Sequence, residues 1–111
     1  MGCRPRGSTI RLATLDDVVP LAQALASAFD PDPWLAWIVP ADRHRARIAA
    51  LQKGLLGVIG VPHGEVWLAA GPGGDLLGGA LWLLAERPVP PEAWAQVAAA
   101  EGALLGERAP A

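Results

Sequence analysis

The sequence is poor in several residue types on which small domains often depend. It has one cysteine among 111 residues, so an internal disulfide framework is excluded. It has no tyrosine either. Cys3, His44 and His63 lack the close spacing of zinc ligands, and no metal site is predicted. The start M-G-C-R-P-R has no apolar segment typical of a secretory signal. We expect a cytoplasmic chain with a flexible terminus at residues 1–8.

Long hydrophobic runs and clustered positive charge are also missing. Hydrophobic residues make up 52% of the sequence, yet no stretch reaches the roughly 18 uncharged apolar residues of a membrane helix. The formal net charge is −2, whereas nucleic-acid binding depends on clustered lysine and arginine. We therefore predict a soluble protein with no membrane or nucleic-acid partner. The length fits one domain, at residues 9–111.

Periodic apolar residues predict a mixed α/β chain of the α+β type. The expected order is β-α-α-β-β-α with a mostly antiparallel sheet. Residues 9–13 alternate like a strand with one buried face. The apolar run 76–84 predicts a strand covered on both faces. A further strand is expected at 63–70, and a loop or short helical turn at 30–40. The first helix starts near Asp16 or Asp17, where Thr14 and Asp17 have the spacing of a capping box. The second is capped by Asp42 and ends at Gly60 and Pro62, and the third starts near residue 92, with Trp94, Val97, Ala98 and Leu105 inward.

The stretch G-P-G-G-D-L-L-G-G-A-L-W-L-L at 71–84 raises two interpretations. A phosphate-binding loop needs lysine after the second glycine of its pattern, and Gly79 stands at that position. A dinucleotide fingerprint needs a third glycine where Leu76 stands, followed by a helix. Two apolar runs separated by Pro, Gly and Asp are instead typical of a β-hairpin. The sequence therefore predicts a hairpin, with a bulge or a close backbone approach at Gly78 and Gly79.

Four segments in this order resemble the GCN5-related N-acetyltransferases. They are I-R-L-A-T-L-D-D-V-V-P-L-A-Q-A-L-A-S-A-F, D-P-W-L-A-W-I-V-P, H-G-E-V-W-L-A and G-G-A-L-W-L, between residues 10 and 83. They look like the first strand and helix of that family, the loop into its second helix, and its next two strands. The resemblance implies acetyl transfer from acetyl-CoA to a primary amine, with no covalent enzyme intermediate.

The chain departs from this family after residue 84. The Q/R-x-x-G-x-G/A turn that holds the acetyl-CoA pyrophosphate is absent from 85–111, and the late tyrosine that often acts as general acid is missing. The sequence thus looks like the amino-terminal half of an acetyltransferase without its cofactor site. The alternative is a non-catalytic module that binds a small molecule or a protein. An unpaired edge at 76–84 would favour a homodimer or pairing with a carboxy-terminal half.

The resemblance places an amine-acceptor pocket at the first two helices and the loop that joins them. Carboxylates beside aromatic rings suit an amine, but Asp-Pro pairs also set turns and tryptophans also fill cores. The candidate acceptor residues are Phe29, Asp30, Asp32, Trp34 and Trp37. Glu65 is the candidate general base by its family position, or else a surface carboxylate at a strand edge.

A basic run after Asp42 also has two interpretations. It could meet an anionic ligand, or it could form a solvated helix face, and the second interpretation is favoured. The run consists of Arg43, His44, Arg45 and Arg47.

Overall fold

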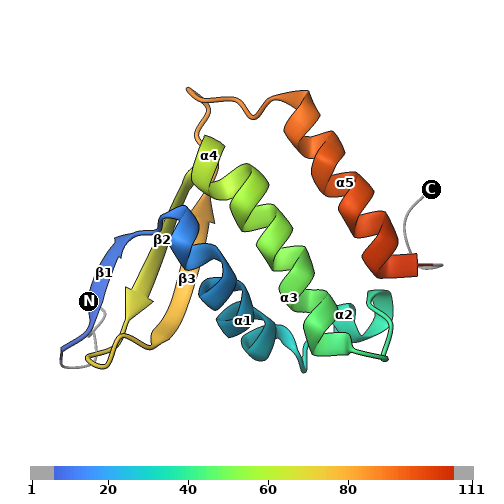
Figure 1. Ribbon diagram of the computed structural model, residues 1–111, viewed down its shortest axis with the longest axis horizontal. Coiled ribbons are helices and arrows are strands. Elements are labelled where there is room, and N and C mark those ends of the chain that lie inside the picture. The colour runs from blue at the N-terminus through green and yellow to red at the C-terminus, as the bar shows by residue number, and fades with distance from the viewer. Residues whose placement is uncertain (1–6, 107–111) are drawn as a thin grey trace.

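A computed structural model describes residues 7–106 of the chain and shows a mixed helix-and-strand fold (Figure 1). Its three strands form one antiparallel sheet in the order β1-β2-β3. The strands are β1 (Thr9–Leu12), β2 (Glu65–Ala70) and β3 (Leu76–Trp82). This confirms the predicted combination of helices with an antiparallel sheet.

Five α-helices are described in the same region. They are α1 (Val18–Phe29), α2 (Pro33–Ile38), α3 (His44–Gly54), α4 (Val61–His63) and α5 (Pro91–Leu105). A π-helical segment, Leu55–Gly60, joins α3 to α4, so the three form one continuous rod (Figure 1). None of the helices in residues 7–106 is long and apolar enough to cross a membrane.

The second predicted helix differs from the structure at both ends. Arg43, with a left-handed φ of 53°, takes the N-cap position that we assigned to Asp42. At the other end the helix continues past Gly60 to His63. We attribute the wider π turn to Pro62, which lacks an N–H and would crowd the Val58 carbonyl in a regular α-helix.

The entry to α1 is fixed by a capping box that the sequence predicts. The Asp17 carboxylate accepts a hydrogen bond from the Thr14 backbone N–H at 2.8 Å. It also accepts hydrogen bonds from Nη1 and Nη2 of Arg11, at 2.8 and 2.9 Å, which connect β1 to the turn before α1. The hydrogen bonds from Arg11 and Thr14 hold the pKa of Asp17 well below its ordinary value of 3.8.

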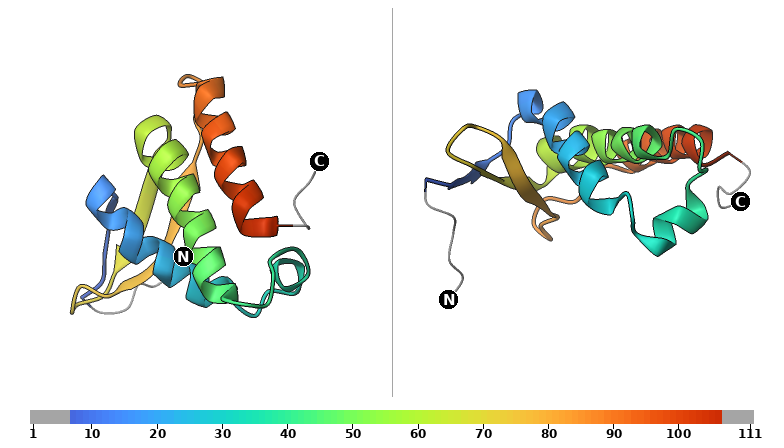
Figure 2. Two further views of the ribbon diagram at one scale, coloured as in Figure 1. Left: turned by 45° about the vertical axis from the view of Figure 1, so that its right-hand side comes forward. Right: turned by 90° about the horizontal axis from the view of Figure 1, so that it is seen from below.

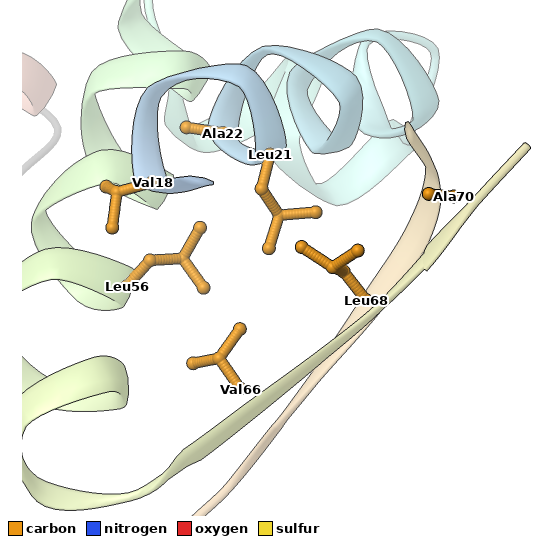
Figure 3. Packing of buried hydrophobic residues seen from close by; sticks show 7 residues of the cluster. All are labelled: Val18, Leu21, Ala22, Leu56, Val66, Leu68 and Ala70. Atoms are coloured by element: carbon orange, nitrogen blue, oxygen red, sulfur yellow. The ribbon is translucent and has the colours of Figure 1, made fainter. Parts of the chain in front are cut away.

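One face of the sheet packs against α1 and the π segment (Figure 3). Val66, Leu68 and Ala70 alternate along β2 and are all at most 8% exposed. They meet Leu21 of α1 and Leu56 of the π segment. We call this the covered face. Its alternation follows the period of two along a strand, which sends every second side chain to the same side.

Two glycines let the layers approach closely. A Cβ on Gly60 would lie 2.7 Å from Val66 Cγ2 and 2.8 Å from Leu81 Cδ1. A Cβ on Gly79 would lie 3.0 Å from Leu21 Cδ1 and 3.1 Å from the Trp67 carbonyl oxygen. The close backbone approach predicted for the Gly78–Gly79 pair is therefore found at Gly79.

The hairpin predicted at 71–84 is confirmed. β2 and β3 pair antiparallel, and the Gly71 N–H donates to the Asp75 carbonyl at 2.8 Å across the turn. Gly74 adopts a φ of +86°, which favours glycine. The strand register is irregular opposite Ala69 and Ala70, where Leu77 is the extra residue of a bulge.

The other face of the sheet has no element packed over it in residues 7–106, and we call it the open face. Two predictions are wrong here: the strand Thr9–Leu12 is exposed along its whole length instead of burying one face, and β3 is not covered on both sides. The helices, α5 included, pack on the covered side or on each other. The large side chains of the open face are Ile10, Leu12, Trp67, Leu77 and Trp82, from 36% to 58% exposed.

Helix α5 lies antiparallel beside α3 and the π segment (Figure 2). Ala93, Val97 and Leu105 are buried, as the period of a helix predicts for a single stripe. Trp94, expected inward, is 42% exposed, and Ala98 is exposed as well. The small residue Ala93 takes the contact with Ile59 in place of the indole.

Candidate functional site

The two predicted acceptor carboxylates have structural partners. Asp32 is the N-cap of α2, and its Oδ1 accepts the backbone N–H groups of Trp34 at 2.9 Å and Leu35 at 3.1 Å. The carboxylate of Asp30 lies 3.2 Å from the guanidinium of Arg45. Both aspartates therefore position the segment between α1 and α3, which matches the turn-setting interpretation of the Asp-Pro pairs.

The three predicted aromatic residues stand at or near α2. Phe29 ends α1 and is 39% exposed, while Trp34 and Trp37 are 62% and 72% exposed. They do not fill the core, in contrast to the alternative considered for the tryptophans. Among them, Trp34 lines a cavity.

This cavity, the interhelix pocket, lies between α2, α3 and α5 and has a volume of about 350 Å³. Most of its wall is aliphatic, which gives an apolar site of a size suited to a small molecule. Its lining comprises Trp34, Leu35, Ile38, Val39, Ile48, Leu51, Gln52, Leu55, Glu101 and Leu105.

Two polar side chains, Gln52 and Glu101, interrupt the apolar lining of the interhelix pocket. Glu101 lies four residues from each of Val97 and Leu105, both of which are buried, so the spacing places it on the inward stripe of α5. Gln52 lies four residues after the buried Ile48 on α3. Sequence reasoning missed both residues, and the available signal was a polar residue on an otherwise apolar helical stripe.

Arg47 links the start of α3 to the end of α5, two of the helices that border the interhelix pocket. Its Nη1 donates to the Leu104 carbonyl near the end of α5 at 2.7 Å, and its Nε and Nη2 donate to the Asp42 carbonyl and carboxylate at 2.9 and 3.0 Å. The side chain is only 16% exposed. The same contact lowers the pKa of Asp42. Arg47 thus connects α3 to α5 and is not part of a solvated helix face.

Other members of the predicted basic run also have partners. Arg45 pairs with Asp30. The Nδ1 atom of His44 lies 3.2 Å from the Pro40 carbonyl oxygen, while its Nε2 is buried without a hydrogen-bond partner. These contacts fix the loop before α3 and gather no anion-binding cluster.

Glu65 is not brought together with the acceptor residues. It opens β2 beyond α4, at the opposite end of the long helical rod from α2 (Figure 1). Its carboxylate accepts a hydrogen bond from the Trp67 Nε1 at 3.1 Å and lies 3.6 Å from Arg87. This geometry gives Glu65 a role in holding the open face and does not place it beside the interhelix pocket.

A second hollow, of about 420 Å³, lies at the other end of α5 beside α4. Pro62, His63, Pro90 and Glu92 border it. It lacks the aliphatic wall of the interhelix pocket, which is the feature that retains a small molecule.

Comparisons and metal chemistry add no further assignment. No protein-family model matches the chain. Within residues 7–106, no three His, Cys, Asp or Glu side chains are grouped as metal ligands. The interhelix pocket is the candidate site because of its apolar lining and its size.

Proposed function

We propose that this chain is an acetyltransferase-like domain that binds a small apolar amine in the interhelix pocket. The observation that carries the proposal is the Glu101 carboxylate on the inward stripe of α5, in a mostly aliphatic pocket with Trp34 on its wall and Gln52 as the other polar side chain. A protonated amine on an apolar body matches this combination. The carboxylate supplies the opposite charge, and the indole face can attract the same cation.

The link to acetyl transfer rests on the resemblance to GCN5-related N-acetyltransferases. It is supported by the antiparallel β2–β3 hairpin and by the helices that follow β1 and precede β2 in the sequence. The reaction would pass an acetyl group directly from acetyl-CoA to the amine, after a base has taken the amine proton. Glu65, the base expected from the resemblance, does not line the interhelix pocket, so another group would have to accept that proton.

Acetyl-CoA would be bound by groups outside this chain. The pyrophosphate-binding turn is absent from the sequence, and after β3 the described chain enters α5 without a fourth strand. We therefore propose that acetyl transfer requires a second polypeptide segment. The same absence favours a second candidate function, a binding module that holds the amine without transferring an acetyl group to it.

Calorimetric titration with 2-phenylethylamine and with 2-phenylethanol tests the amine site. Both probes share the apolar body, but only the amine carries the charge that Glu101 would recognise. We expect the amine to bind the wild-type chain about tenfold more tightly than the alcohol, and Glu101→Gln to remove this preference. Glu92→Gln, on the same helix but outside the interhelix pocket, is the matched control and should retain the preference.

Equal affinity for the two probes, or a preference that survives Glu101→Gln, would contradict the amine site. Titration with acetyl-CoA separates the two candidate functions. Micromolar binding by this chain would favour an enzyme with a cofactor site of its own. Amine binding without acetyl-CoA binding would favour the module or a domain that depends on a second segment.

A further inference from the structure

The open face of the sheet carries an apolar patch that the interhelix pocket does not explain. Ile10, Leu12, Leu77 and Trp82 are 54%, 49%, 50% and 58% exposed, and Trp67 is 36% exposed. A large apolar side chain presents about 150–250 Å², so half exposure of five such residues gives a patch of about 500 Å². This is near the upper end for the largest patch on a monomer, and patches of this size mark interaction sites.

The five residues share one side of the sheet. Leu12 pairs with Trp67 and Ile10 with Ala69 across β1 and β2, while Trp67 pairs with Ala80 and Glu65 with Trp82 across β2 and β3. Directly paired residues project from the same face. The bulge residue Leu77 joins them along the wall of a shallow groove. The patch is therefore continuous over all three strands.

The open face has a projection at one end of β3 and a groove at the other. We take Trp82, a large side chain that is 58% exposed, as the projection. The groove has a volume of about 320 Å³, runs along Gly78 and Ala80, and has Trp67 on its wall. A Cβ on Gly78 would meet no atom within 4 Å, so the space above this residue is empty. Four residues of strand separate the two features by about 13 Å.

We propose that the open face binds a second copy of this chain, with the two sheets packed face to face. A two-fold axis that runs midway between the two sheets, perpendicular to β3 and over Ala80, brings Trp82 of each copy over the Gly78 groove of the other. The two contacts are identical and the assembly closes as a dimer. Face-to-face packing of twisted sheets is a standard arrangement in proteins.

The area fits such a dimer. The patch and the small residues between its side chains would bury about 600–800 Å² per copy, close to the size of a standard interface. Its centre is aromatic, and tryptophan is enriched among residues that dominate binding. We therefore expect a dimer with a Kd of about 1–10 µM.

The chemistry of the open face favours a second copy over a polar ligand. Glu65 lies on this face, and its carboxylate already accepts a hydrogen bond from Trp67 and lies 3.6 Å from Arg87. The groove itself is lined by Ile10, Trp67, Leu68, Ala69, Leu77, Gly78, Gly79 and Ala80, which offer no charged side chain to a ligand. An identical apolar face is complementary to such a lining.

Sedimentation equilibrium of the wild-type chain and three variants tests this proposal. Trp82→Ser removes the projection, and Gly78→Leu fills the groove at a position where the monomer has room. Each should weaken the dimer by about 30-fold or more. Trp94→Ser removes an exposed tryptophan from α5, away from the open face, and should leave dimerisation unchanged. Circular dichroism of each variant checks that the monomer is folded.

Two results would overturn the proposal. One is a wild-type chain that stays monomeric up to about 200 µM, well above the expected Kd. The other is a dimer that Trp82→Ser and Gly78→Leu, both folded, leave unchanged. That outcome would point to pairing along the exposed edge of β3, which leaves the open face uncovered.

Discussion

The two faces of the sheet are built from the same strands but are used in opposite ways. On β2 the side chains of Val66, Leu68 and Ala70 are at most 8% exposed on the covered face, while Trp67, between them in sequence, lies on the open face. Apart from Glu65, the β2 residues of both faces are apolar, so hydrophobicity alone does not tell which face a helix will cover. The larger aromatic residues are on the open face. The difference teaches that the core lies on the covered side of the sheet, and it is the basis of our proposal that the open face is an interaction surface.

The largest expected effect comes from shortening one leucine on each face. Leu68→Ala opens a cavity in the covered face and should lower the free energy of unfolding by about 3–4 kcal/mol. Leu12→Ala, on the open face, should lower it by less than about 1 kcal/mol when the chain is monomeric. Chemical denaturation at low protein concentration measures both. Equal losses for the two variants would contradict the division into a core face and an interaction face.

Substitution of Arg47 tests whether the contact between α3 and α5 stabilises both the fold and the interhelix pocket. Arg47→Ala removes charged hydrogen bonds to the Leu104 carbonyl and to Asp42, and we expect a loss of about 2 kcal/mol. Affinity for 2-phenylethylamine should fall as well, because the end of α5 loses its attachment. Arg45→Ala, which removes an exposed ion pair, should change the free energy of unfolding by less than about 1 kcal/mol. Thermal and denaturant unfolding measure both losses. Equal losses for the two variants would contradict the role of Arg47 as the link between α3 and α5.

Two adjacent glycines sharpen the comparison of the faces. A Cβ on Gly79 would press on Leu21 and on the Trp67 carbonyl, so Gly79→Ala should cost about 1–2 kcal/mol. A Cβ on Gly78 meets open space, and Gly78→Ala should change the free energy of unfolding by no more than about 0.5 kcal/mol. Denaturant unfolding of the pair checks the orientation of β3. The reverse order of effects would mean that the faces are assigned the wrong way round.

Asp17 gives the smallest effect and a defined pH dependence. Asp17→Asn removes the ion pair with Arg11 and weakens the capping box, at a cost of about 1 kcal/mol at neutral pH. Because the folded-state pKa of Asp17 lies below its ordinary value of 3.8, its contribution is present above that pH and is lost as the pH falls. The gap between wild type and variant should therefore narrow below about pH 4. Asp16→Asn serves as the control, and a gap that widened in acid would contradict this account.

Local patterns in the sequence predicted much of the fold. The capping box at Thr14 and Asp17, the hairpin at 71–84 and the start of α5 follow from residue types with short-range physical effects. The burial of each strand face did not follow, because it depends on where the helices pack after they form. The predicted burial of one face of residues 9–13 failed for this reason.

The candidate site was predictable only in part. The sequence directed attention to α2, and Trp34 does line the interhelix pocket. Asp30 and Asp32 are instead engaged in an ion pair and a helix cap, which compete with ligand binding for the same oxygens. Glu101 comes from α5, more than sixty residues away in the sequence, and only the packing of α5 on α3 brings it to this site.

The most direct test of the central claim is chemical-shift mapping of the ¹⁵N-labelled chain during titration with 2-phenylethylamine. We predict that shifts concentrate at Trp34, Gln52 and Glu101 around the interhelix pocket, while Trp67 and Trp82 on the open face stay unchanged. Chemical-shift changes confined to the open face would contradict the assignment of the interhelix pocket as the amine site. So would the absence of any change at the highest amine concentration.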